Sequence, residues 1–163
     1  MTDVSAFKQA MSRFPSGIVI ATTVDGKGGL WGFTASSFTS VSLDPPLVLV
    51  CPAKSASCYA AFKAANLFAI NILASDGESL AKRFATRGAG KFAGDHFVIA
   101  ENGLPLIRNA VAVLICRKFA DHDGGDHAII VGEVRSVTLA KGTESLVYYR
   151  QKFGRFALAP DDC

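Results

Sequence analysis

A run of hydroxyl-bearing and small side chains is the most chemically suggestive feature of the sequence. Residues 34–42 read T-A-S-S-F-T-S-V-S, and we interpret them as one extended segment. Side chains this small let a planar ligand lie close to the backbone and take hydrogen bonds from it. The same alternation also fits the solvent face of an ordinary strand. The segment is therefore a candidate wall for a ring system.

A candidate anion site follows shortly afterwards. The apolar run Leu47 to Cys51 ends at Pro52, and Lys54, Ser55 and Ser57 come next. We predict a helix over 55–65 that begins at Ser55, so that its free amides and positive dipole end face the end of the strand. The hydroxyls and the lysine charge would suit a phosphate monoester. Helix capping by Ser55 would equally explain that serine without any ligand.

Several motif-like stretches do not fit the chemistry they suggest. Residues 26–32 lack the third glycine of a dinucleotide fingerprint, because Trp31 stands there, and residues 88–91 lack a phosphate-loop hydroxyl, because Phe92 follows them. Residues 121–127, D-H-D-G-G-D-H, could in principle hold a cation, but the Gly-Gly pair between two long strand-like runs favours a hairpin turn. No serine lies in a G-x-S-x-G context. We expect neither a metal site nor a serine nucleophile.

Composition sets the broad class of the protein. The chain has 163 residues, 50% of them hydrophobic and 19% charged, with a formal net charge of +3. We expect one folded domain over residues 1–163. The basic residues are scattered, which argues against nucleic acid as a partner, and the longest apolar run, 110–116, is far shorter than the roughly 20 residues of a membrane span. Without an apolar leader at its start, the chain is expected to be cytoplasmic, and its four cysteines reduced.

The elements that would position these residues are mostly strands. A helix is predicted at the start of the chain, where Phe7, Ala10, Met11 and Phe14 have helical spacing. Short β-rich runs separated by Gly, Pro, Asp and Asn predict about seven strands, and hence a barrel or sandwich. The fold class is therefore mainly β with flanking helices. The expected strands are 18–24, 30–38, 46–51, 67–73, 110–120 and 127–140, and the expected helices are 4–14, 55–65 and 76–86.

The stretch 32–53, G-F-T-A-S-S-F-T-S-V-S-L-D-P-P-L-V-L-V-C-P-A, resembles the short-chain flavin reductases, the reductase components of two-component flavin-dependent monooxygenases. The resemblance extends over about residues 5–157. It implies an FMN-binding split β-barrel that works as a homodimer, with each flavin near the subunit interface. Further matching stretches are 91–95, 103–106, 125–127, 132–134 and 146–150, together with Phe153.

The resemblance also assigns the candidate site residues. It implies that seven residues line the isoalloxazine ring and the ribityl chain, namely Thr34, Ala35, Ser36, Ser37, Phe38, Ser40 and Val41. The segment that takes the phosphate is Ser55, Ala56 and Ser57, and later flavin contacts are Phe62, Lys91 and Phe92. Positions associated with the nicotinamide are His127, Tyr149 and Arg150. The family often has glycine after the Tyr-Arg pair, whereas this chain has Gln151.

The implied activity is hydride transfer from NADH or NADPH to FMN or FAD, with the reduced flavin supplied to a partner monooxygenase. Such an enzyme needs no nucleophile, because the cofactors carry the chemistry and the protein positions them. His127 is expected to seat the nicotinamide. A flavin carrier or sensor without turnover is the alternative. A third possibility, a protein like pyridoxamine phosphate oxidase, would need a basic cluster beside residues 34–40, and the sequence has none there.

Overall fold

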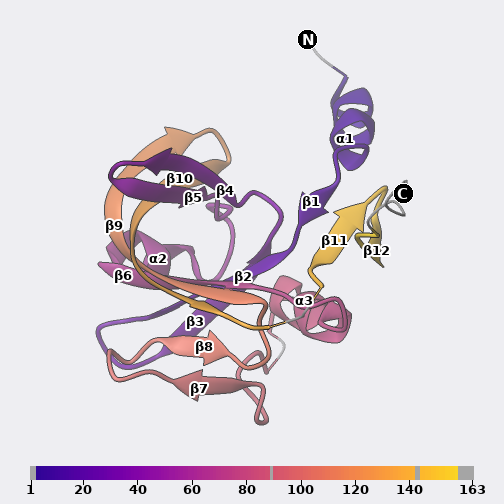
Figure 1. Cartoon of the computed structure of the whole chain (residues 1–163). Coiled ribbons are helices and arrows are strands. Elements are labelled where there is room, and N and C mark those ends of the chain that lie inside the picture. The colour runs from indigo at the N-terminus through magenta and orange to yellow at the C-terminus, as the bar shows by residue number, and fades with distance from the viewer. Residues whose placement is uncertain (1–2, 89, 142–143, 158–163) are drawn as a thin grey trace.

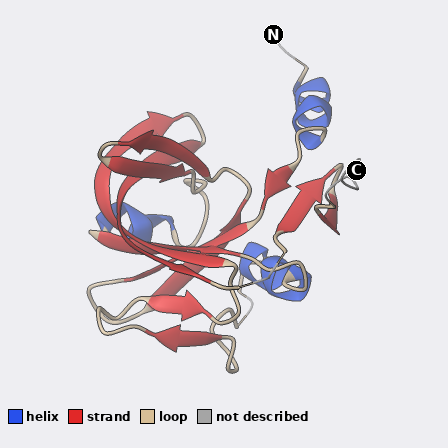
Figure 2. Ribbon diagram, in the orientation of Figure 1, coloured by secondary structure: helices blue, strands red, loops and turns tan. Residues whose placement is uncertain are grey.

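The computed structural model describes residues 3–88, 90–141 and 144–157 (Figure 1). The helices lie outside the sheets (Figure 2). They are α1 (Val4–Ser12), α2 (Tyr59–Ala64) and α3 (Glu78–Ala85). The strands are β1 (Ser16–Gly17), β2 (Val19–Val24), β3 (Leu30–Ala35), β4 (Thr39–Leu43), β5 (Pro46–Val50), β6 (Leu67–Ile72), β7 (Phe97–Ile99), β8 (Pro105–Ile107), β9 (Ala112–Gly124), β10 (His127–Leu139), β11 (Leu146–Tyr149) and β12 (Lys152–Arg155).

A strongly curved seven-stranded sheet forms the body of the protein (Figure 1). Its order is β3-β2-β6-β9-β10-β5-β4, and every neighbouring pair is antiparallel. Strands β3 and β4 are therefore its two edges, although only residues 36–38 separate them in the sequence. The sheet is not closed between them. The prediction of a mainly β fold with flanking helices is confirmed, and the open seam corresponds to the split of a split barrel.

Both faces of β2, an interior strand of the sheet, are buried at its start. Val19 and Ala21 belong to one apolar cluster, whereas Ile18 and Ile20 belong to a second. This explains why residues 18–21 are continuously apolar instead of alternating. Buried Asn71 is satisfied by long-range bonds: its Nδ2 donates to Ile20 O at 2.9 Å, and its Oδ1 accepts from Ile107 N at 2.9 Å. These bonds fix the small β7-β8 sheet against the main one.

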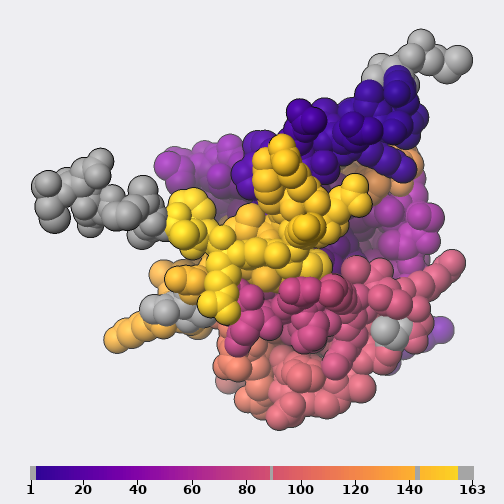
Figure 3. Space-filling view, turned by 90° about the vertical axis from the view of Figure 1, so that its right-hand side faces the viewer, coloured from indigo at the N-terminus to yellow at the C-terminus, as the bar shows by residue number. Residues whose placement is uncertain are grey.

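The N-terminal helix α1 stands away from the body (Figure 1). The Asp3 carboxylate caps it by accepting from Ser5 N, and the helix buries none of its residues. The predicted helix is confirmed, ending slightly earlier than expected. Its large apolar side chains Val4, Phe7 and Met11 are exposed, as is Phe14 two residues after its end. The sheet β1-β11-β12 lies next to this segment (Figure 3).

Two predictions about local structure were wrong. The helix expected from Ser55 begins only at Tyr59, and residues 54–58 form turns. The segment 34–42 is not one extended run either, because it bends at Ser36 before β4 begins. The Ser37 hydroxyl, just before β4, accepts from Cys51 N, just after the neighbouring strand β5, at 3.0 Å, and this bond holds the bend. The sequence also gave no indication of β7, β8 or β12. Within the described residues, no helix has the length and apolar character needed to cross a membrane.

Candidate functional site

A cavity of about 540 Å³ lies where three segments meet: the end of β3, the turns that follow β5, and the stretch from the end of α3 to Lys91. Its volume is within the range usual for small-molecule sites. Nine predicted site residues line it: Thr34, Ala35, Ser36, Ser37, Ser55, Ala56, Ser57, Lys91 and His127. Residues far apart in the sequence are thus gathered around one space large enough for a ring with a phosphorylated chain.

The wall predicted to face a ring, residues 34–37, is held in place by two side-chain hydrogen bonds. The Thr34 hydroxyl donates to Ala81 O at 2.6 Å, and the Ser37 hydroxyl is occupied by Cys51 N. These two hydroxyls therefore fix the wall in place. The amides of Ser36 and Ser37 follow the edge strand β3 and donate to no acceptor among the described residues. They are the hydrogen-bond donors that a planar ligand with carbonyl and ring-nitrogen acceptors would use.

The predicted anion-binding end of the cavity is a turn and not the helix end that the sequence suggested. Helix α2 has six residues, and its N-cap is Cys58, which makes no side-chain cap bond. Long-range pairing holds the turn: Ala53 forms a β-bridge with His127, and Lys54 N donates to Asp126 O at 2.9 Å. The amides of Ser55 and Ser57 have no acceptor among the described groups. Two amides and two exposed hydroxyls therefore remain for an anion.

Lys91 brings a fixed positive charge to the same cavity. Its Nζ donates to Phe84 O at 2.8 Å and to Gly32 O at 3.1 Å, and no carboxylate of the described residues is paired with it. Burial lowers the pKa of Lys91, because the charged form loses solvation. A half-buried ammonium held by neutral carbonyls is well placed to attract a phosphate.

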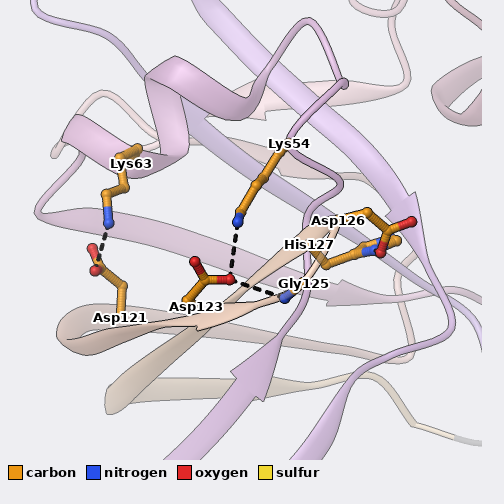
Figure 4. A network of polar contacts seen from close by, with 7 residues as sticks. All are labelled: Lys54, Lys63, Asp121, Asp123, Gly125, Asp126 and His127. Carbon is orange, nitrogen blue, oxygen red and sulfur yellow. Dashed lines mark hydrogen bonds and ion pairs between the residues drawn. The ribbon is translucent and has the colours of Figure 1, made fainter.

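The β9-β10 hairpin carries His127 to the cavity (Figure 4). The predicted hairpin is confirmed, with its turn between Gly124 and His127. Two ion pairs tie its first strand, β9, to residues 54–64, which include the predicted anion turn: Lys54 contacts Asp123 at 2.9 Å and Lys63 contacts Asp121 at 2.6 Å. These hydrogen bonds lower the pKa of each aspartate. Figure 4 shows both lysines reaching from that segment to the hairpin.

The His127 ring is oriented by its neighbour in the sequence. Its Nδ1 lies 2.7 Å from Asp126 Oδ1, and this contact lowers the pKa of Asp126. Because an ionised carboxylate can only accept, we assign the hydrogen to Nδ1, which leaves Nε2 of the neutral ring as an acceptor. In the described part of the chain, no three His, Cys, Asp or Glu side chains are grouped so as to hold a metal ion.

Five predicted flavin contacts do not line this cavity. Phe62 is 1% exposed and stacks edge-on behind Phe33, with ring centroids 5.0 Å apart. Phe38 packs against the same core cluster. Ser40 and Val41 are exposed on the edge strand β4. Phe92 lines a separate, neighbouring cavity. These residues support the walls or lie beside the site in a single chain.

Tyr149 and Arg150 also lie outside the cavity. They are at the hairpin between β11 and β12, in the small separate sheet. The Arg150 guanidinium lies over the Tyr149 ring at 5.4 Å, and Arg150 N donates to Ser12 O at the end of α1. In the described chain, the two predicted nicotinamide positions at the C-terminal end are therefore associated with α1 and not with His127.

The structure adds cavity residues that the sequence did not single out. Arg87 follows α3 and is exposed at the cavity, where it adds a second cationic side chain. The basic residues at 82–83, 87 and 91 could have indicated a cationic segment at the site. Placing Arg87 at the cavity, however, required knowing where α3 ends. Cys58 is buried, and burial raises the pKa of its thiol, so it remains neutral. The remaining additions are Phe33, Cys51, Ala53, Phe84 and Ala85.

Comparisons with known proteins agree with this geometry. Residues 11–157 match the family model described as "Flavin reductase like domain". The chain is 42% identical over 152 residues to "FMN reductase (NADH) SmoA" of Agrobacterium fabrum, covering 93% of this chain and 86% of that protein. It is 35% identical over 151 residues to "Flavin-dependent monooxygenase, reductase subunit HsaB" of Rhodococcus jostii, covering 93% and 77%. A solved structure, the Streptomyces globisporus C-1027 NADH:FAD oxidoreductase SgcE6 in complex with NAD and FAD fragments, aligns with a TM-score of 0.90 at 38% identity over 99% of this chain and 96% of that one.

Proposed function

This chain belongs to the flavin reductase like domain family, and from that premise we propose how its cavity works. Its reaction is the reduction of a flavin by NADH, which supplies reduced flavin to a monooxygenase component. The observation that carries the assignment is the single cavity that joins a wall of free amides to an anion-binding turn, with His127 at the rim. A flavin mononucleotide has the same order of parts: an acceptor-rich ring, a chain and a phosphate.

When bound together, the dihydronicotinamide donates a hydride to the flavin ring and the reduced flavin results. The chain's own contribution is positioning, since reacting atoms must approach to about 3–3.5 Å. We assign the ring edge to the amides of Ser36 and Ser37. Donors fixed there also stabilise the negative charge that grows on the ring during reduction, an effect of the oxyanion-hole kind. The bonds of Thr34 and Ser37 to Ala81 and Cys51 keep these donors from reorganising.

We assign the phosphate to the turn at Ser55–Ser57 and to Lys91. The turn offers amides and hydroxyls, and the Lys91 ammonium adds charge from the opposite segment. Charge-assisted hydrogen bonds of this type are stronger than those between neutral groups. The assignment therefore predicts that most of the binding free energy of FMN beyond that of riboflavin comes from these residues.

We assign the nicotinamide to His127. Its Nδ1 is occupied by Asp126, so Nε2 is free to accept from a carboxamide N–H at the rim of the cavity. The role is positioning, with no proton transfer required for hydride transfer itself. A histidine needed only to hold the hairpin would not have to line the cavity, and this placement favours an enzyme over a flavin carrier.

We also propose that the chain acts as a homodimer. Val4, Phe7, Met11 and Phe14 leave an apolar face exposed on and just after α1, and such a face is usually covered by a partner. Tyr149 and Arg150 lie beside the end of that helix and away from the cavity of their own chain. A second copy packed on α1 would let these residues reach its nicotinamide site. The cytoplasmic location expected from the sequence remains part of this proposal.

One set of assays tests the function. Purified protein is mixed with NADH or NADPH and with FMN, FAD or riboflavin in turn, and the loss of reduced-nicotinamide absorbance is followed. We expect turnover with NADH and at least one flavin. Flavin binding without any loss of NADH would replace the reductase with a carrier, and no flavin binding would refute the site. Light scattering of the same sample at several concentrations tests the dimer.

A further inference from the structure

The β9-β10 hairpin has a strand edge without a β-partner at the end that carries His127. Strand β9 pairs with β6 only as far as Arg117, so residues 118–124 pair with β10 alone. Lys118 N donates to Asn66 O at 2.8 Å, and beyond that bond no strand of the described chain lies along this edge. On the β9 side, the tip of the hairpin is therefore held by side chains.

The segment between β5 and β6 crosses this part of the hairpin. In the sheet order β6-β9-β10-β5, the chain leaves β5 on one side of the hairpin and enters β6 on the other. Two lysines of the segment reach β9: Lys54 Nζ lies 2.9 Å from Asp123 Oδ1, and Lys63 Nζ lies 2.6 Å from Asp121 Oδ1 (Figure 4). The two aspartates are two residues apart on one strand, so their side chains lie on the same face. The segment is thus held to β9 at two points.

The proposed phosphate donors lie between these two points. Ser55 and Ser57 stand between Lys54 and Lys63 in the sequence. Backbone bonds tie the start of the turn to the residues around His127. At the other end, α2 meets the hairpin through Lys63, whose ammonium and carbonyl both contact side chains of β9. The turn proposed to hold the phosphate is therefore anchored to the hairpin on both sides.

The two lysines act on the hairpin and not on a ligand. Neither Lys54 nor Lys63 lines the main cavity, although the sequence suggested the charge of Lys54 for the phosphate. Their side chains are 37% and 50% exposed, and ion pairs this exposed contribute little to folding stability. The buried Phe62 side chain also holds α2 in the core independently of them. Their consequence is therefore expected in the placement of the segment and only slightly in folding.

We propose that Asp121 and Asp123 are positioning residues for hydride transfer. Through the two lysines they fix the turn at 55–57 relative to His127, and with it the distance between the flavin anchor and the nicotinamide seat. The inference rests on the proposed function, which makes those assignments. Neither aspartate lines the cavity. Because reaction requires a close approach of two atoms, a loosened turn should slow hydride transfer more than it weakens either ligand.

The test compares the double variant Asp121→Asn/Asp123→Asn with the parent protein in anaerobic single-turnover reduction of FMN by NADH, both at saturating concentration. We expect the rate constant to fall by roughly tenfold, less than the loss that a full misplacement of about 1 Å can cause. The Kd values of FMN and riboflavin should change by less than about twofold, because every direct contact remains. Partial unfolding would instead lower the amplitude of the reaction. A parent-like rate constant, or a loss confined to the amplitude or to Kd, would overturn the proposal.

Glu78→Gln is the matched control for the loss of a carboxylate. It breaks the Lys82–Glu78 pair, which is also partly exposed and lies within α3, so that it joins neither the turn nor the hairpin. Neither residue lines the cavity. We expect the rate constant of the parent. If Glu78→Gln slows reduction as much as the double variant does, loss of surface charge explains the effect and the proposal fails.

Exchanging the charges of one pair separates positioning from phosphate binding. Lys54→Asp places two carboxylates side by side and should slow the reduction. Adding Asp123→Lys restores opposite charges in reversed order, and we expect it to recover most of the rate constant. If Lys54 bound the phosphate directly, the exchanged pair would stay slow and would bind FMN weakly relative to riboflavin. That result would overturn the role of this pair.

The two proposals fail in different ways. If the parent protein reduces neither FMN nor FAD with NADH, the proposed function is wrong and this inference falls with it. If the parent reduces FMN and the double variant does so at the same rate, only the positioning role is wrong. Should the variants not fold, the parent decides: because salt screens exposed ion pairs, its rate constant at saturation should fall as KCl is raised, and a rate constant independent of salt would overturn the proposal.

Discussion

Replacing Ser55 and Ser57 together by alanine separates the phosphate end of the site from its ring end. Both side chains are exposed in the turn, and neither hydroxyl bonds to another described residue. The double substitution therefore removes ligand contacts without breaking an internal bond. The turn itself should persist, because Lys54 N on Asp126 O and the Ala53–His127 bridge hold it through the backbone.

The expected loss follows from the number and setting of the bonds. A hydrogen bond to a charged group contributes about 1.5–3 kcal/mol, and exposed hydroxyls belong at the lower end of that range. Two such bonds amount to roughly 3 kcal/mol, or about a 150-fold weaker affinity for FMN at 1.4 kcal/mol per tenfold. The amides of the turn and Lys91 are unchanged, so measurable affinity should remain. Riboflavin has no phosphate, and its affinity should be nearly that of the parent.

The assay is quenching of flavin fluorescence, with FMN and riboflavin titrated into parent and variant. Ser79→Ala is the matched control, because Ser79 is exposed on α3 and does not line the cavity. We expect it to bind both flavins like the parent. An unchanged ratio of FMN affinity to riboflavin affinity in the double variant, whether both affinities fall equally or neither falls, would refute the assignment of the phosphate to this turn.

Three further predictions concern other parts of the molecule. His127→Ala should raise the KM for NADH by about two- to tenfold, the equivalent of one neutral hydrogen bond, and leave flavin affinity unchanged; an unaltered KM in steady-state assays would exclude His127 from the nicotinamide site. Gly132→Ala should lower the free energy of unfolding by about 1–3 kcal/mol in urea titrations, because the new Cβ would collide with the buried Phe68 ring; parent-like stability would show that the core has space there. Lys63→Met should lower the free energy of unfolding at neutral pH, and progressively less as pH falls below about 5. The pKa of Asp121 is lowered in the folded protein, so its stabilising charge is present above the usual 3.8 and is lost as pH falls through the folded-state pKa. A stability difference between parent and variant that persists in strong acid would contradict the ion pair.

Much of the fold was predictable, because hydrophobic patterning and turn residues report on local structure. The strands at 18–24, 46–51 and 67–73 were placed to within about two residues, since each is a mostly apolar run bounded by turn residues. The start of α2 was not predictable. Ser55 has the chemistry of a helix cap, but Asp126 and His127, about 70 residues later, hold the backbone of residues 53–54 in a turn. Local propensity cannot register a contact at that distance.

The site was predicted in part. As with the fold, residues in local sequence patterns were found, whereas placements set by long-range packing were not. The predicted residues that do line the cavity are those of the segments at 34–37 and 55–57, together with Lys91 and His127. Phe62 lies on α2, directly after the turn, but its large aromatic side chain packs in the core behind Phe33 and not against the cavity. Arg87 was missed because its placement depends on where α3 stops. Such contacts are set by packing and not by sequence spacing.

The anion turn and His127 are parts of one mechanical unit. Strand β10 pairs with β5 from Ile130–Val50 to Glu133–Leu47, and the pairing continues beyond the strands through Ala128 N on Pro52 O and the Ala53–His127 bridge. As long as this pairing is kept, a movement of the hairpin carries the proposed phosphate donors and the proposed nicotinamide seat together. Because hydride transfer depends on the relative position of two bound rings, a unit that moves both ends as one preserves their spacing. The Lys54–Asp123 and Lys63–Asp121 ion pairs join the same two segments. They therefore help to fix the position of the turn and the hairpin together, and not the position of one ligand alone.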